Sequence, residues 1–241
     1  KNIKKYTPGF NIHDIQKKYK IKKVIKLASN ENPFISDKVL SFIKKPNHKI
    51  NLYPDSNPNE LHKLIASTIG HRISCDNIIL GNGSNEVLEF IVRATLDNKS
   101  EVIIPKHSFL VYEIISKLQN AKIITTKPDS NKSTDNYLGI NLESIIERIT
   151  KKTKLIFIAN PANPTGTYIK LSKIEKFLKS VPKNIYIIID EAYYEYLNPN
   201  KNKSAVSLLK KYKNLFVTRS FSKMYGLASL RVGYGVSSLD N

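Results

Sequence analysis

One lysine in this chain lies in surroundings that favour covalent chemistry. Residues 220–233 have the sequence SFSKMYGLASLRVG, so Lys223 stands among hydroxyl and small apolar residues, eight positions before Arg231. A lysine in such a site can be held partly neutral, and a neutral amine is a nucleophile toward a carbonyl carbon. Taken alone, the segment also fits an ordinary surface lysine, so the chemical interpretation depends on what accompanies it.

A second segment places acidic and phenolic side chains directly after an apolar run. Residues 185–189 are IYIII, and Asp190 follows them in the motif DEAY, which ends at Tyr193. Burying a carboxylate is costly unless it is paired with a cation. Asp190 is therefore predicted to meet a protonated partner. The alternative is an N-cap at a strand-to-helix junction.

Two further segments have the composition of ligand-binding turns. GNGSNE at residues 81–86 combines glycines with the expected start of a helix, whose free N–H groups and dipole favour a phosphate. A tight turn without a ligand is the alternative. NPANPTG at residues 160–166 contains two prolines and a glycine, which restrict the loop and fix the directions of its Asn side chains. An ordinary Asn-Pro turn would have the same composition.

The hydrophobic pattern indicates the elements that must position these residues. Seven short runs rich in Ile, Val and aromatic residues are predicted as strands, and several are apolar throughout, as in strands buried on both faces of a parallel sheet. Segments with helical spacing alternate with them. The predicted fold is a three-layer α/β/α sandwich with a mainly parallel seven-stranded sheet, whose ligand site lies at the carboxyl ends of the strands. The strands are expected at residues 77–80, 101–105, 121–125, 154–159, 184–190, 214–218 and 231–236.

Helix starts and irregular segments are also marked in the sequence. Asn57-Pro58 predicts an N-cap followed by a proline in the first turn, and SKIE at residues 172–175 predicts a capping box. Residues 1–35 are mixed in character and rich in lysine, and they are predicted as an arm that leads into the main domain. The polar stretch 128–137 is predicted as a loop.

Composition argues against several classes of protein. The hydrophobic fraction of 41% and the charged fraction of 24% are ordinary for a folded chain and argue against disorder. No window of eighteen apolar residues predicts a membrane-spanning helix, and the first residues lack the apolar core of a signal peptide. Cys75 is the single cysteine, so no intramolecular disulfide can form, which fits a cytoplasmic location.

The formal net charge of +19 raises nucleic-acid binding as an alternative. The chain has 39 Lys and Arg against 20 Asp and Glu, but only five of the basic residues are Arg. The abundant Lys, Ile and Asn all have AT-rich codons, whereas surfaces that bind phosphate backbones usually use Arg as well as Lys. We therefore attribute the charge to codon composition, and expect neither a nucleic-acid nor a membrane partner.

Together, these segments supply phosphate donors, a carboxylate in need of a cation, a phenol, a fixed amide and a nucleophilic lysine. Pyridoxal 5′-phosphate (PLP) requires such a set from its protein. The sequence also resembles a known family, the fold-type I, class I/II aminotransferases, and within it most closely the histidinol-phosphate branch. The motifs that carry the resemblance are LASNENP (27–33), YPD (53–55), GNGSNE (81–86), NPANPTG (160–166), DEAY (190–193) and SFSKMYGLASLRVG (220–233).

The resemblance implies a role for each matched residue at the ring of the cofactor. Lys223 would bond covalently to PLP and later transfer a proton, and Asp190 would pair with the protonated pyridine nitrogen. Tyr193 and Asn163 would hydrogen-bond the hydroxyl oxygen of the ring. The family resemblance implies no metal.

The resemblance also implies residues for the phosphate, the ring face and the substrate. The phosphate would be held by Arg231, Ser220, Ser222, Ser84 and Asn85. His107 matches the position whose aromatic ring stacks on the cofactor, and Tyr53 matches a tyrosine that reaches the phosphate of the neighbouring subunit, which implies a homodimer. Asn30 and Glu31 would lie on the substrate side, next to Phe34-Ile35, where the family commonly has a turn that contains Gly.

The activity implied is transamination between L-glutamate and imidazole-acetol phosphate, a step of histidine biosynthesis. Aromatic-amino-acid transamination and threonine-phosphate decarboxylation share these motifs and stay open, as does an inactive fragment with a basic nucleic-acid-binding surface. Residues 1–35 would form the N-terminal arm and part of a small domain, and residues 36–241 the PLP-binding large domain. Family members run roughly a hundred residues further. The C-terminal small domain is therefore expected to be absent, and the chain to show little activity alone.

Overall fold

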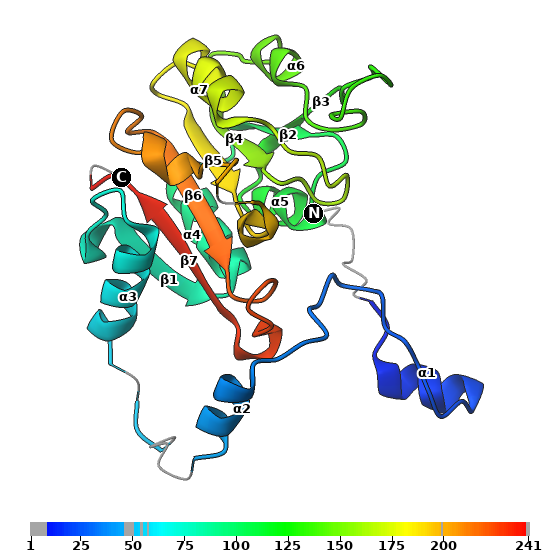
Figure 1. Cartoon of the computed structure of the whole chain (residues 1–241). Helices are drawn as coiled ribbons and strands as arrows, with labels where there is room; N and C mark the ends of the chain where they lie inside the picture. The colour runs from blue at the N-terminus through cyan, green and yellow to red at the C-terminus, as the bar shows by residue number, and fades with distance from the viewer. Residues whose placement is uncertain (1–8, 46–50, 54, 57, 199, 240–241) are drawn as a thin grey trace.

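A single seven-stranded sheet organises the chain (Figure 1). The computed structural model describes residues 9–45, 51–53, 55–56, 58–198 and 200–239. The strands lie in the order β1-β7-β6-β5-β4-β2-β3, and neighbours run parallel except that β7 is antiparallel to both β1 and β6. The mainly parallel sheet that the sequence predicts is confirmed. The strand bounds are β1 Ile78–Asn82, β2 Glu101–Pro105, β3 Lys122–Thr126, β4 Thr153–Ala159, β5 Tyr186–Asp190, β6 Leu215–Ser220 and β7 Val232–Ser237.

Helices cover both faces of this sheet, which confirms the three-layer α/β/α sandwich. On one face, α4 (Ser84–Thr95) and α5 (Leu110–Leu118) contribute to an apolar cluster that includes Phe157. On the other face, α6 (Leu142–Ile146) and α7 (Leu171–Ser180) contribute to a second cluster. The other helices are α1 Ile12–Tyr19, α2 Asp37–Ile43 and α3 Asn59–Ile69, with 3-10 turns η1 Cys75–Asn77, η2 Tyr194–Tyr196, η3 Ala205–Leu208 and η4 Ala228–Leu230.

The apolar strands are explained by burial on two sides. In β5, Ile187 and Ile189 join the cluster of α6 and α7, while Ile188 joins the cluster of α4 and α5. All three side chains are fully buried. Burying one such side chain stabilises the fold by about 1.5–3 kcal/mol, so the alternating use of both faces favours an apolar residue at every position of the strand.

Three local predictions differ from the structure. Helix α7 begins at Leu171 with Lys170 as its N-cap, so Ser172 lies inside the helix and the predicted capping box does not form. Helix α3 begins after Pro58, which is itself the N-cap, and Asn57 lies outside the described residues. The connections from β5 to β6 and from β6 to β7 contain 3-10 turns in place of α-helices; the first is rich in Asn and Ser, and the second contains Gly226 and two serines.

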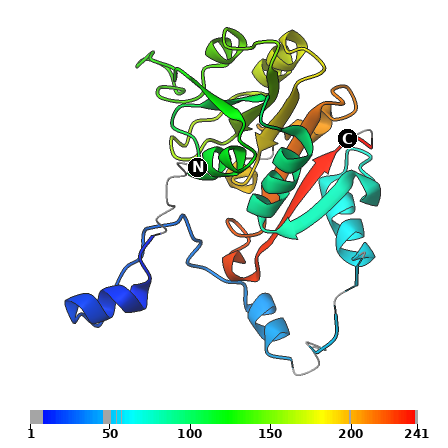
Figure 2. The same cartoon turned by 180° about the vertical axis from the view of Figure 1, so that it is seen from behind.

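The described part of the N-terminal arm and the helix α2 that follows it project from the sheet domain, as Figures 1 and 2 show from opposite sides. Neither α1 nor α2 contains a buried residue. Several large apolar side chains of this part of the chain are exposed, namely Phe10, Leu27, Phe34 and Phe42. The arm therefore contributes little to the apolar core of the sheet domain.

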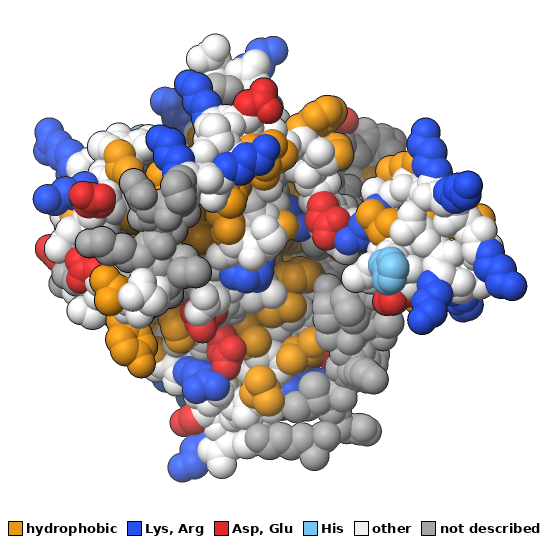
Figure 3. Space-filling view, turned by 90° about the horizontal axis from the view of Figure 1, so that it is seen from below, with side chains coloured by type: hydrophobic (Ala, Val, Ile, Leu, Met, Phe, Trp, Pro, Cys, Tyr) orange, Lys and Arg blue, Asp and Glu red, His pale blue; other side chains and the backbone are white. Residues whose placement is uncertain are grey.

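The face of the molecule seen in Figure 3 is mixed in character. In the view of Figure 3, basic side chains are dispersed among acidic and apolar ones.

The predicted loop at 128–137 is confirmed, since it contains turns and one isolated bridge between Pro128 and Ile140. No helix within the described part of the chain has the length and apolar character needed to cross a membrane.

Candidate active site

The carboxyl ends of the parallel strands border a cavity of about 440 Å³, where the sequence predicts the ligand site. All but two of the predicted site residues line it. From the sheet domain they are Ser84, Asn85, Asn163, Asp190, Tyr193, Ser220, Ser222, Lys223 and Arg231, and from the arm they are Asn30 and Glu31. Residues as far apart in the sequence as Asn30 and Arg231 therefore meet at one site.

Lys223 is held in the half-buried state that its chemistry needs. Its Nζ donates a hydrogen bond to the carbonyl oxygen of Ser29 at 2.9 Å, and it lies 5.6 Å from the centre of the Tyr193 ring. Burial lowers the pKa of the Lys223 ammonium, an effect that the charges of Glu31 and Asp190 oppose. The amine is therefore easier to deprotonate than an ordinary surface lysine.

Asp190 ends β5 as a buried carboxylate that is 6% exposed. It accepts hydrogen bonds from the Tyr112 hydroxyl at 2.6 Å, the Thr218 hydroxyl at 3.1 Å and the Ala192 N–H at 3.2 Å. Burial raises the pKa of Asp190, while these hydrogen bonds oppose the rise. No ion pair forms between Asp190 and any cation of the described residues, so the cationic partner predicted from the sequence is not a side chain of this part of the chain.

A positively charged side chain, in contrast, lies where α4 begins. Gly83 is the N-cap with φ +80°, and a Cβ there would lie 2.3 Å from Nη2 of Arg231, so the turn requires glycine. Arg231 donates from Nη1 to the Ser222 hydroxyl at 3.2 Å and from Nη2 to the Asn82 carbonyl at 3.4 Å. The guanidinium and the helix N-terminus thus lie together, an arrangement that favours an anion.

The two Asn residues of the loop after β4 have different tasks. Asn160 is buried, and its amide exchanges two hydrogen bonds with the backbone of Ile169, at 2.8 and 2.9 Å. Asn163 lines the cavity. The first amide therefore fixes the loop that presents the second.

Tyr193 is tied to the arm. Its hydroxyl accepts a hydrogen bond from Asn30 Nδ2 at 3.0 Å, and Asn32 Nδ2 donates to the Met224 carbonyl at 2.9 Å, next to Lys223. Burial raises the pKa of Tyr193, so its hydroxyl stays protonated at neutral pH. The arm therefore closes the side of the cavity where the tyrosine and the lysine lie.

Two predicted residues do not line the cavity. His107 has a left-handed backbone with φ +61°, and its Nδ1 lies 3.3 Å from the carbonyl oxygen of Leu138. Phe109, two residues further on, is an aromatic residue that does line the cavity. Tyr53 is fully exposed, so within one chain it contacts nothing at the site.

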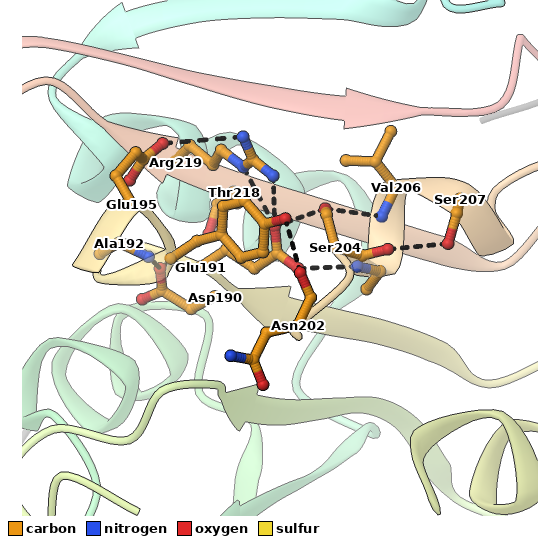
Figure 4. Close-up of polar contacts among 12 residues, drawn as sticks. Asp190, Glu191, Ala192, Glu195, Asn202, Ser204, Val206, Ser207, Thr218 and Arg219 are labelled. Carbon is orange, nitrogen blue, oxygen red and sulfur yellow. Dashed lines mark hydrogen bonds and ion pairs between the residues drawn. The ribbon is translucent and has the colours of Figure 1, made fainter. Parts of the chain in front are cut away.

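The sequence interpretation did not identify Tyr112, Thr218 or the pair of Glu191 and Arg219. Glu191 is buried and accepts two hydrogen bonds from the Arg219 guanidinium, from Nε at 3.0 Å and from Nη2 at 2.9 Å (Figure 4). Glu191 is the second residue of the motif DEAY, and Arg219 immediately precedes the motif that begins at Ser220. An acidic and a basic residue at the ends of neighbouring strands were a usable signal. Tyr112 carried no such signal, since it fits the apolar face of a helix.

The cavity fits PLP because it offers one suitable group, or set of groups, to each reactive part of the cofactor. Arg231, two serine hydroxyls and the start of α4 suit a phosphate dianion. Asp190 is a buried carboxylate without a cation among the described residues, which suits the protonated nitrogen of a pyridine ring. Lys223 is an amine with a lowered pKa that lines the same cavity, which suits an aldehyde carbon.

Comparison with similar proteins agrees with the assignment of the cavity to PLP. A sequence model of the family "Aminotransferase class I and II" matches residues 22–240. Histidinol-phosphate aminotransferase 1 of Idiomarina loihiensis is 40% identical over 238 residues, which is 98% of this chain and 62% of the relative. Histidinol-phosphate aminotransferase 2 of Carboxydothermus hydrogenoformans is also 40% identical, over 97% of this chain and 63% of the relative. The chain thus spans less than two thirds of the length of these relatives.

Solved structures show the same fold. A histidinol-phosphate aminotransferase from Sinorhizobium meliloti in complex with PLP superposes with a TM-score of 0.84 at 24% identity, over 96% of this chain and 61% of the other. One from Clostridium acetobutylicum gives 0.73 at 30% identity, over 87% and 59%. Because the family match covers nearly the whole chain and the cavity offers what a PLP enzyme needs, the chain belongs to the class I and II aminotransferases, a PLP-dependent family.

Proposed function

We propose that the protein transfers an amino group between L-glutamate and imidazole-acetol phosphate, with PLP bound in the cavity at the carboxyl ends of the strands. The observation that carries this proposal is that Lys223 and Asp190 line one cavity with an anion-binding helix start. The names of the relatives from Idiomarina and Carboxydothermus support the choice of substrate.

The residues would divide the work as follows. When bound, PLP withdraws electrons from the carbon that carries the substrate amino group. Lys223 would hold the cofactor through its Nζ, and the same atom would carry a proton to and from the substrate carbon, which its lowered pKa favours. Asp190 would hold the proton on the ring nitrogen.

The remaining residues would orient the cofactor. Arg231, with Ser220, Ser222 and the backbone around Ser84 and Asn85, would bind the phosphate. Tyr193 and Asn163 would hydrogen-bond the ring hydroxyl. Asn30 would hold the Tyr193 hydroxyl from the arm side, through the 3.0 Å hydrogen bond between them.

The proposed organisation of the whole protein includes a second subunit. Residues 1–35 would belong with a small domain, and residues 36–241 form the PLP-binding large domain. Tyr53 would reach the phosphate site of a partner copy, which agrees with a side chain that is fully exposed in one chain. Cross-linking at a cysteine introduced at position 53 tests this homodimer.

Covalent labelling tests the assignment of the lysine. The chain is incubated with PLP, reduced with borohydride, digested and mapped. The pyridoxyl group is expected on the peptide that contains Lys223, and Lys223→Arg should abolish it. Lys26→Arg is the matched control, because Lys26 pairs with Glu31 at 2.7 Å in the arm and has no assigned role in covalent binding. A label on another lysine would refute the assignment.

A substrate panel tests the reaction itself. The 241-residue chain and a form extended to the length of its relatives are assayed with L-glutamate and imidazole-acetol phosphate, with phenylpyruvate, and with O-phospho-L-threonine. Turnover of the first pair is expected to exceed that of the others in the extended form. Preferred transamination of phenylpyruvate, or release of carbon dioxide from phosphothreonine, would replace the proposed substrate with an alternative.

A further inference from the structure

The Asp190 carboxylate has an unequal set of donors on its two oxygens. Oδ1 accepts from the Thr218 hydroxyl at 3.1 Å and from the Ala192 N–H at 3.2 Å. Oδ2 accepts from the Tyr112 hydroxyl at 2.6 Å. The two oxygens thus depend on three different elements, namely β6, the turn after β5, and α5.

Counting acceptor positions shows where a ligand can bind. An ionised carboxylate offers about four positions, two on each oxygen. The two positions of Oδ1 are taken, and one position of Oδ2 is taken by Tyr112. Within the described residues no fourth hydrogen-bond donor contacts Asp190, which lines the cavity and is 6% exposed. The position left on Oδ2 is therefore the one available to a cation in the cavity.

Tyr112 is held firmly in place. Its side chain is 1% exposed, its ring stacks on Phe157 with centres 4.5 Å apart, and Phe109 packs edge-on at 5.8 Å. Burial and the nearby charge of Asp190 raise the pKa of Tyr112 well above its usual range, so the hydroxyl remains a donor. A fixed ring and a permanent proton make Tyr112 a constant donor to Oδ2.

We infer that Tyr112 is a positioning residue for Asp190: its hydroxyl occupies one position of Oδ2, leaves the other for the protonated ring nitrogen, and keeps the carboxylate ionised. This inference rests on the proposed PLP function of the cavity. Tyr112 itself needs no contact with the ring, since it acts through the oxygen that it shares with the ligand.

Other groups face the same carboxylate and bear on its titration. Glu191 beside it and the Tyr193 phenol lie after β5, and Lys223 lies in the segment after β6. Glu191 raises the pKa of Asp190 further, whereas the hydrogen bond from Tyr112 lowers it. Removing that hydrogen bond leaves the other groups in place, so Asp190 should take up a proton at a higher pH.

The first test measures PLP binding to the chain as a function of pH. In Tyr112→Phe, which keeps the ring against Phe157, we expect affinity to be lost at a pH about one unit higher than in the wild type, on the scale of one lost hydrogen bond to a carboxylate. Thr218→Val removes a donor from Oδ1 and should shift the profile in the same direction. Tyr186→Phe is the matched control: this tyrosine lies on β5, the strand of Asp190, packs against Phe216, and should leave the profile unchanged when replaced.

The second test follows Asp190 without PLP. The ¹³C signal of its carboxyl carbon, assigned by its loss in Asp190→Asn, is titrated in the wild type and in Tyr112→Phe. The midpoint is expected to rise in the variant. Suppose that Tyr112→Phe lowers the melting temperature but has the wild-type midpoints both in the pH profile of PLP binding and in the titration of Asp190. Tyr112 would then only pack in the core, and the inference would be overturned. If the wild type fails to bind PLP, the proposed function fails, while this titration still decides the role of Tyr112 toward Asp190.

Discussion

Asp190 and Glu191 are consecutive buried carboxylates, yet they differ in how completely they are paired. Glu191 is 2% exposed and accepts from Arg219, from the Ser204 hydroxyl at 2.7 Å and from the Ala205 N–H at 2.7 Å (Figure 4). Asp190 accepts from three neutral donors and contacts no cation of the described residues. Glu191 accepts four hydrogen bonds, two of them from a cation, whereas Asp190 accepts three, all from neutral donors.

This difference separates a structural site from a binding site within two residues. The Glu191–Arg219 pair joins the end of β5 to the end of β6, and Arg219 also packs over the Tyr194 ring at 4.2 Å. The pair therefore fixes the carboxyl ends of β5 and β6, where Asp190 lies and after which Lys223 follows. An incompletely paired buried carboxylate beside a rigid ion pair indicates where a cationic ligand belongs.

The largest effect is expected from breaking the structural pair. Glu191→Ala leaves the buried Arg219 guanidinium without its main partner, which should cost about 3–5 kcal/mol of unfolding free energy. Urea denaturation measures this loss. Glu191→Gln keeps the shape and an acceptor oxygen, and should lose less. Equal stability of the alanine variant and the wild type would remove the structural role from Glu191.

Replacing the other carboxylate should affect rate and leave the fold intact. Asp190→Asn removes the charge that we propose holds the proton on the ring nitrogen, and loss of such a preorganised charge lowers turnover by on the order of a hundredfold. The measurement is single-turnover transamination in the extended form, with the circular dichroism spectrum as the control for folding. A variant that turns over like the wild type would show that Asp190 is not the partner of the ring.

The same substitution should change the pH dependence of stability in the chain without PLP. The folded-state pKa of Asp190 lies above the ordinary value of 3.8. Between these two values the folded state binds more protons than the unfolded state, so wild-type stability falls as the pH rises. Asp190→Asn lacks this loss, and its stability relative to the wild type should grow from acid to neutral pH. A constant difference in unfolding free energy across that range would contradict the raised pKa.

The smallest effect is expected at an exposed pair. Lys211 and Glu175 form an ion pair at the surface, where solvent screens the interaction. Lys211→Gln should leave the melting temperature unchanged within error and PLP binding unaffected. A clear loss of stability would mean that buried and exposed ion pairs differ less in their contributions to stability than their burial indicates.

Much of the fold could be predicted because local patterns determine it. The apolar run at residues 185–189 predicts a doubly buried strand, and β5 ends at Asp190 as expected. The contacts of Asp190 could not be predicted, since Tyr112 and Thr218 are 78 and 28 positions away in the sequence. The contact of His107 Nδ1 with the Leu138 carbonyl, 31 positions away, likewise follows from no local pattern.

The antiparallel strand β7 has a consequence for the order of events during synthesis. In the sheet β1 is an edge strand whose one neighbour is β7, and Ile78 pairs with Val236. Because the ribosome synthesises the chain from its N-terminus, β1 emerges long before its partner strand β7 has been made. The parallel strands β2 to β6 can associate earlier, whereas the start of α4 docks beside Arg231 only when β7 emerges. Assembly of the proposed phosphate site is therefore a late event of folding, which depends on the longest loop that the sheet closes.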